Sequence, residues 1–171
     1  MKKAISFVVV LVITALAVVG ILIAIVALVA GSTELSHHEY VQKLSGLDIS
    51  GGTIISVVDT HGGFHGDGEL VVAFDCAEIA DSVDEQMEGW KPLPMTENLQ
   101  RLMYGGEQGG GIGGSAGIPE IRNGYYFFWD RHSESTDPTN ESELNNRHSW
   151  NFTLMLYDTD HSILYLFEFD T

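Results

Sequence analysis

The chain begins with a long, uninterrupted run of apolar positions. Residues 4–30 follow Lys2 and Lys3, hold no charged side chain and consist mostly of Val, Ile, Leu and Ala. As a helix this run would extend about 40 Å at roughly 1.5 Å per residue, more than the roughly 30 Å of hydrocarbon in a bilayer. It predicts a transmembrane anchor, with residues 1–3 in the cytoplasm because basic flanks stay on that side.

A cleaved secretory signal is the alternative for this run. The apolar core of such a signal is normally about 7–15 residues long. The run here is roughly twice that length, and Leu28 stands where a cleavage site after Ala30 would need a small residue. We therefore favour an uncleaved signal-anchor in the cell membrane, which makes the protein single-pass and places residues 31–171 outside the cytoplasm.

Short polar and apolar segments follow the anchor. Residues 31–50 are mostly polar and predict a stalk that leads to a domain over residues 51–171. Residues 53–58 and 70–74 are short runs rich in β-branched and apolar side chains, a composition typical of strands. A loop of roughly a dozen residues joins them, so a long hairpin is the simplest topology.

Two segments with helical spacing come next. Residues 76–87 carry apolar side chains at every fourth position and follow Asp75, which can cap a helix. Residues 96–104 also show helical spacing, with Thr96 as the N-cap. The glycine-rich residues 105–117 then predict a flexible loop.

The last third of the chain shows strand patterns. Residues 125–129 are aromatic at every position, which is typical of a strand covered on both faces. An acidic stretch, residues 133–146, predicts an exposed loop. Residues 150–157 and 163–169 alternate with a period of two and predict a C-terminal hairpin. The whole pattern predicts an α+β domain, with a mainly antiparallel sheet of about five strands and two helices on one face.

Charge narrows the classes of partner. Outside the predicted anchor and its basic flank, the chain holds 24 acidic residues and 6 basic ones, a net charge of −18. Nucleic acid and anionic membrane surfaces would be repelled, whereas cations or basic partners would be attracted. Cys76 is the only cysteine, so the domain has no internal disulfide. An extracytoplasmic domain without a disulfide suits a bacterium with a single membrane.

Side chains that can bind a metal ion or transfer a proton are concentrated in residues 59–69. This stretch holds four glycines, two histidines and three carboxylates. Two more polar residues, Asp130 and His132, follow the aromatic strand. They could join this stretch if the ends of the strands over 53–58 and 125–129 meet in the sheet. The candidate binding residues are Asp59, His61, His65, Asp67, Glu69, Asp130 and His132.

Three interpretations of this stretch remain open. Tight folding of the glycines could gather Asp59, His61, His65 and Asp67 around a divalent cation such as calcium, zinc or manganese. The stretch could instead be structural, with an Asx-turn at Asp59, glycines at positive φ and histidines bonded to backbone. Catalysis would use a histidine as general base with an aspartate to orient it. The glycines favour the structural interpretation, because they explain a turn without any ligand.

Four blocks of the chain form a recognisable set: DTHGGFHGDG at 59–68, WKPLPMTENL at 90–99, GYYFFWDRHS at 124–133 and the segment from Asn151 to Asp160. In this order they resemble a family of small, membrane-anchored proteins of clostridial-type Gram-positive bacteria. The resemblance spans roughly residues 50–171. It implies kinship and a location at the cell surface, and it implies no catalytic residues.

Taken together, these patterns predict a membrane-anchored protein that displays an acidic interaction or sensing domain outside the cell. The alternative is a metal-dependent hydrolase that uses Asp59, His61, His65 and Asp67. Neither interpretation is supported by a known sequence motif around a catalytic nucleophile. The sequence therefore identifies neither the partner nor the substrate.

Overall fold

A computed structural model of the chain describes residues 17–19, 21, 35–62, 66–106 and 110–171. The chain divides into two compact units, Met1–Ser36 and His37–Thr171. In the first unit, residues 17–19 and 21 are helical, and the rest of the predicted anchor lies outside the described residues. Within the described part of the chain, no helix has the length and apolar character needed to cross a membrane.

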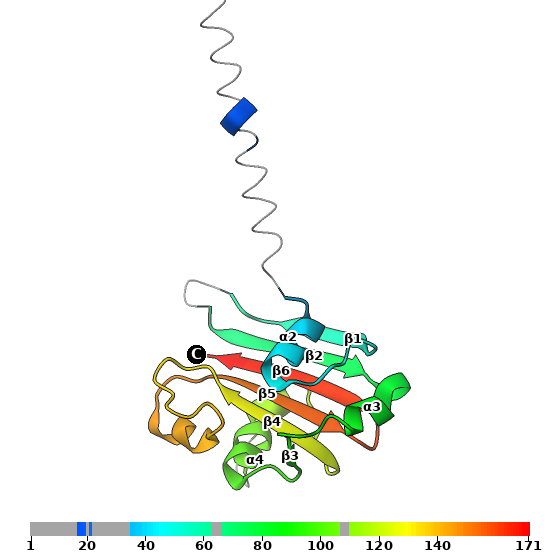
Figure 1. Cartoon of the computed structure of the whole chain (residues 1–171). Helices are drawn as coiled ribbons and strands as arrows, with labels where there is room; N and C mark the ends of the chain where they lie inside the picture. Colours follow the sequence, from blue (N-terminus) through cyan, green and yellow to red (C-terminus); the bar gives the residue numbers. More distant parts are fainter. Residues whose placement is uncertain (1–16, 20, 22–34, 63–65, 107–109) are drawn as a thin grey trace, which may run out of the picture. The chain divides into compact units, whose positions relative to one another are not determined.

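The second unit is an α+β domain built on one antiparallel sheet of six strands. The strand order is β1-β2-β6-β5-β4-β3, so β1 and β3 form the two edges (Figure 1). The strands are β1 (Thr53–Asp59), β2 (Gly68–Asp75), β3 (Lys91–Pro92), β4 (Gly124–Asp130), β5 (Asn151–Asp158) and β6 (Ile163–Asp170). The two predicted hairpins, β1 with β2 and β5 with β6, are both present, and β2 pairs with β6 to join them.

Helices cover both faces of the sheet, whereas the sequence predicted them on one face. Central strands have apolar side chains on both sides: in β5, Met155 belongs to one hydrophobic core and Leu154 to the other. Both faces therefore need a cover to exclude water. The helical elements are α2 (His37–Ser45), η1 (Ala77–Ile79), α3 (Ala80–Asp84), α4 (Glu97–Tyr104), α5 (Ile112–Ser115) and η2 (Glu141–Asn146).

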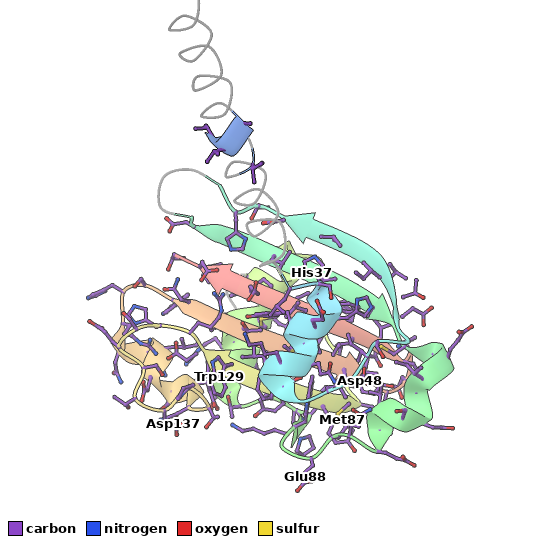
Figure 2. All side chains as sticks on the ribbon, turned by 45° about the horizontal axis from the view of Figure 1, so that its top comes forward. His37, Asp48, Met87, Glu88, Trp129 and Asp137 are labelled. Carbon is purple, nitrogen blue, oxygen red and sulfur yellow. The ribbon has the colours of Figure 1, made fainter. Side chains whose placement is uncertain are left out.

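The first core lies under α2, which crosses the sheet in Figure 2, and under α3. Val41 of α2 is fully buried there against strand residues such as Leu166. The second core lies under α4, whose Leu99 and Met103 are fully buried. Thr96 caps α4 as predicted, because its side chain accepts a hydrogen bond from the backbone N–H of Leu99.

The segment expected to be a polar stalk is part of the fold from His37 onward. Residues 37–45 form α2, and Leu47 and Ile49 after it are fully buried in the first core. The sequence of this segment is mostly polar because most of its residues lie on the exposed face of the helix, and only a few of its side chains are buried. The folded unit therefore begins at residue 37 and not at residue 51.

Two other predicted segments differ in detail. The helix predicted over residues 76–87 is a 3₁₀ turn, η1, followed by the short helix α3, because Ile79 has a φ of −123°, away from helical values. The loop predicted over residues 133–146 contains η2, and its Leu144 is buried in the second core. One buried leucine in an acidic stretch gives no periodicity from which to predict an element.

Candidate functional site

Polar side chains gather at one end of the sheet, which we call the polar end. Because neighbouring strands are antiparallel, β1, β4 and β6 finish at the same end. Each of these three strands finishes in an aspartate: Asp59, Asp130 and Asp170. The loop after β1 and the chain after β4 both start from the polar end.

His61 contacts carboxylates through both nitrogens of its ring. The Oδ1 atom of Asp59 lies 2.8 Å from the His61 Nδ1 atom and also accepts the backbone N–H of His61 at 2.9 Å. The Nε2 atom of His61 lies 3.0 Å from the Oδ2 atom of Asp170. The loop after β1 is therefore held against the end of β6 through one imidazole.

Arg131, directly after β4, reaches the same carboxylate. Its guanidinium donates to the Asp170 Oδ2 atom at 3.0 Å and to the backbone carbonyl of Phe152 at 3.1 Å. Its Nε atom lies 3.6 Å from a carboxylate oxygen of Glu168. The other oxygen of Asp170 accepts from Asn151 at 2.8 Å. Asp170 thus joins the loop after β1 to the chain after β4.

Tyr40 connects the polar end to α2. Its hydroxyl donates to Glu168 at 2.5 Å and lies 3.1 Å from the hydroxyl of Thr153, which is fully buried. Burial, and then the hydrogen bond to Glu168, raise the pKa of Tyr40 to about 12, so the phenol keeps its proton. Tyr40 thus fixes α2 to β5 through the hydroxyl of Thr153 and to β6 through the carboxylate of Glu168.

The charges at the polar end favour an imidazolium between two carboxylates. Burial lowers the pKa of His61, but the hydrogen bonds to Asp59 and Asp170 outweigh it, so the pKa is raised. Burial raises the pKa of Asp170, but hydrogen bonds from Arg131 and Asn151 outweigh that effect and the pKa is lowered. A protonated histidine with both N–H groups donated can neither ligate a metal nor accept a proton. In this arrangement His61 acts as a clasp between β1 and β6.

The sequence left open whether the two polar clusters meet, and the structure connects them through Arg131, a residue that was not among the candidates. Asp130 is buried and pairs with Arg147, and His132 lies 3.1 Å from the hydroxyl of Ser149. Arg131, between these two candidates, makes the connection to His61 through Asp170.

The remaining predicted site residues have backbone roles or lie outside the described residues. The backbone carbonyl of Asp67 accepts from Gly62 at 3.4 Å, and the backbone N–H of Glu69 donates to the Thr60 hydroxyl at 2.9 Å. His65 lies outside the described residues, so the full metal set stays a prediction. Among the residues that the structure does describe, no three His, Cys, Asp or Glu side chains are arranged to hold a metal ion.

Sequence reasoning missed Arg131, Asp170, Glu168 and Tyr40 as members of the polar end. A usable signal was present for two of them. Arg131 is one of only six basic residues after the predicted anchor, and it directly follows an aromatic strand. Glu168 is a charged position within an otherwise apolar strand, and such a charge needs a partner when its neighbours are buried.

β1 is exposed along its whole length. The exposed fractions of its aliphatic side chains are 37% for Ile54, 53% for Ile55, 48% for Val57 and 50% for Val58. One edge of β1 pairs with β2, and in the described part of the chain no strand pairs with the other edge. The strand presents apolar side chains and an open backbone edge to its surroundings.

A hollow of about 340 Å³ lies beside the second core. It is bordered by α4, α5 and η2 and has apolar and polar walls, including Leu102, Ile112, Trp150, Arg101 and Glu141. The Trp150 indole N–H already donates to the carbonyl of Leu144 at 3.0 Å. This hollow is of ligand size, and its polar groups show no convergent catalytic arrangement.

The only cysteine is buried. Cys76 follows β2 in the first core, and burial raises the pKa of its thiol to about 11. A thiol that stays protonated at neutral pH is a poor nucleophile, as expected for a cysteine at a buried strand end.

Comparison of the chain with known protein families, characterised proteins and solved structures finds no match.

Proposed function

We propose that this protein displays an acidic interaction or sensing domain, residues 37–171, on the outer side of the cell membrane. Its anchor would be the apolar run over residues 4–30, with the N-terminus in the cytoplasm. The uncharged length of that run and its basic flank support this placement. From the sequence blocks, we further infer kinship with the small membrane-anchored proteins of clostridial-type Gram-positive bacteria.

The observation that carries an interaction role is the exposure of β1. Natural proteins seldom leave an edge strand with several exposed aliphatic side chains, because such an edge recruits other chains. Every residue of β1 is exposed, and Ile55, Val57 and Val58 are each about half exposed or more. A binding surface explains why the strand keeps these side chains.

The alternative function, a metal-dependent hydrolase, has weaker support. It would need a ring nitrogen of His61 as a ligand or base. Both nitrogens of His61 contact carboxylates, and its raised pKa favours the protonated ring. The interaction role places no such demand on His61.

Membrane topology can be tested on the full chain in a Gram-positive host. A reporter enzyme that is active only outside the cytoplasm is fused after Thr171, and a second reporter that is active only inside is fused at the same place. We expect activity from the first fusion alone. Activity from the cytoplasmic reporter alone would contradict the proposed location.

The interaction role can be tested in the same cells by photocrosslinking. A benzophenone amino acid replaces Val57 in β1 and, as a matched control, replaces the exposed Ser133 far from β1 along the chain. We expect a crosslinked product from position 57 and none from position 133. Equal products from both positions, or none from position 57, would refute β1 as a binding surface.

A further inference from the structure

We propose that β1 binds an extended, basic segment of a partner protein, which adds to the sheet as a further strand. This inference rests on the proposed interaction role and names its site and the chemistry of the partner. The segment would carry aliphatic side chains together with lysine or arginine.

The backbone of β1 provides the first argument. An edge strand offers a row of unpaired N–H and C=O groups, and an extended peptide can pair with them. β1 pairs with β2 along its length, but its register shifts between Ile54 and Ser56. The regular stretch after this bulge, residues 56–59, is where added backbone pairing is expected.

The side chains of β1 provide the second argument. The devices that protect an edge strand include lysine, proline, inward-pointing charge and β-bulges, and β1 has one of them, the bulge between Ile54 and Ser56. Residues 53–59 contain no lysine and no proline, and Asp59 at the end of the strand is the only charged residue among them. Val57 and Val58 are consecutive in the strand, so they point to opposite faces of the sheet. A partner strand can therefore make apolar contacts on both faces.

Charge decides what kind of segment fits. Residues 44–90, which include β1, β2 and α3, contain ten Asp and Glu residues and no Lys or Arg. Exposed carboxylates flank β1 at both ends: Asp59 ends the strand, and Asp75 lies opposite Thr53 in the register with β2. A basic segment would be attracted to this region, and an acidic one would be repelled.

The same charge argues against two other occupants of β1. A second copy of the chain paired at β1 would bring its own Asp59 and Asp75 to the interface and no compensating Lys or Arg from residues 44–90. An anionic membrane surface would be repelled for the same reason. A lipid interior would also leave the polar backbone of an open edge without partners.

Direct binding tests this proposal on the full chain in zwitterionic detergent micelles. The main probe is a fluorescent eight-residue peptide in which lysine alternates with valine. One control peptide has glutamate in place of lysine, and another has proline in place of two central valines, which removes backbone donors. Fluorescence anisotropy gives the affinity of each peptide, and hydrogen exchange reports which amides become protected.

We expect the lysine peptide to bind at least about tenfold more tightly than either control, and more weakly as salt is raised. Amides of β1 should gain protection. Val57→Lys, which places a charge on the strand, should weaken binding at least about tenfold, whereas Ser133→Lys, with the same change of charge, should change it less than about twofold. Equal binding of the glutamate peptide, or an equal effect of both variants, would overturn the proposal.

The outcomes separate this inference from the interaction role on which it rests. If light scattering shows a dimer that Val57→Lys dissociates, the partner is a second copy and the basic-segment proposal fails. If vesicles of phosphatidylglycerol bind and the lysine peptide does not, the proposal also fails. In both cases a crosslink from position 57 would still support β1 as a binding surface. Loss of that crosslink would remove the interaction role itself.

Discussion

Aspartate ends each of the five long strands, and in four of them it has the same local role. The carboxylates of Asp59, Asp75, Asp130 and Asp158 each accept the backbone N–H of the residue two positions later, at 2.9 to 3.0 Å. Such Asx-turns bend the chain out of the strand and satisfy a donor that the sheet no longer pairs. An aspartate after an apolar run was thus a better marker of strand ends in this chain than of a ligand site.

His61 should make the folded domain less stable as the pH rises above about 6.5. Burial lowers its folded-state pKa, but hydrogen bonds to Asp59 and Asp170 outweigh that effect and raise it. The stabilisation is therefore complete below the unfolded pKa of about 6.5 and is lost as the pH rises through the folded value. The pKa values of Asp59 and Asp170 are lowered, so their contribution is lost as the pH falls below about 4.

Thermal unfolding of the full chain and of His61→Gln between about pH 4 and 9 checks this expectation. Near pH 5 the variant should be less stable by about 1 kcal/mol, a modest value because the ring is partly exposed. The difference should shrink above about pH 6.5, while Arg131 stays charged throughout. A difference that does not depend on pH would show that the imidazolium does not form the clasp.

At the scale of elements, the same composition led to different positions in the sheet. β1 and β2 are both rich in valine and isoleucine or leucine, and both were predicted as strands. β2 lies between β1 and β6 and is buried over most of its length, whereas β1 lies at the edge and is exposed. Strand propensity reports a preference for extended backbone and says little about which strand is central.

Gly124, at the start of β4, is required by the geometry of that strand. It has a φ of +142°, and a Cβ atom there would lie 1.9 Å from the carbonyl oxygen of Tyr157 on β5. Gly124→Ala should therefore cost at least about 3 kcal/mol, because backbone strain and a clash with main chain add. Urea unfolding measures this cost.

Gly46, directly after α2, is the matched control for backbone strain alone. It also has a positive φ, +79°, but no atom lies within 4 Å of the place of a Cβ. Gly46→Ala should cost only about 1–2 kcal/mol, the penalty for an L-residue in that conformation. Equal costs for the two variants would mean that the contact with β5 relaxes and that strain alone explains the effect.

At the scale of the whole molecule, charge is the dominant property, with a formal net charge of −16 at pH 7. The acidic region over residues 44–90 holds no Lys or Arg to offset its carboxylates. Self-repulsion should lower stability at low ionic strength, so sodium chloride should raise the thermal midpoint by a few degrees as it is increased from about 0.02 to 0.3 M. A midpoint that falls with salt would contradict this view.

The same measurement tests the predicted metal set of Asp59, His61, His65 and Asp67. A cation that binds the folded state specifically raises the midpoint in a saturable way, beyond the general effect of salt. Because the His61 ring is engaged by two carboxylates, we expect calcium, zinc and manganese to act only as salts at matched ionic strength. A saturable rise that His61→Ala with His65→Ala abolishes would instead establish the metal site.

The sequence by itself determined the α+β class, the two hairpins, the capped helix α4 and the acidic surface. These features follow from local rules: alternation, helical spacing, turn residues and net charge act over a few neighbouring positions. The same local signals identified the loop over residues 59–69 as unusual, and its Asx-turn at Asp59 could be anticipated from the residue type.

Only the tertiary structure decided which side chains share the polar end and which strand lies at the edge. Asp170 meets His61 across 109 positions of the chain and meets Arg131 across 39. No local pattern contains such contacts, because strand order places β6 between β2 and β5. The same order leaves β1 without a second neighbour in the described sheet, and this is why its aliphatic side chains, unlike those of β2, are exposed.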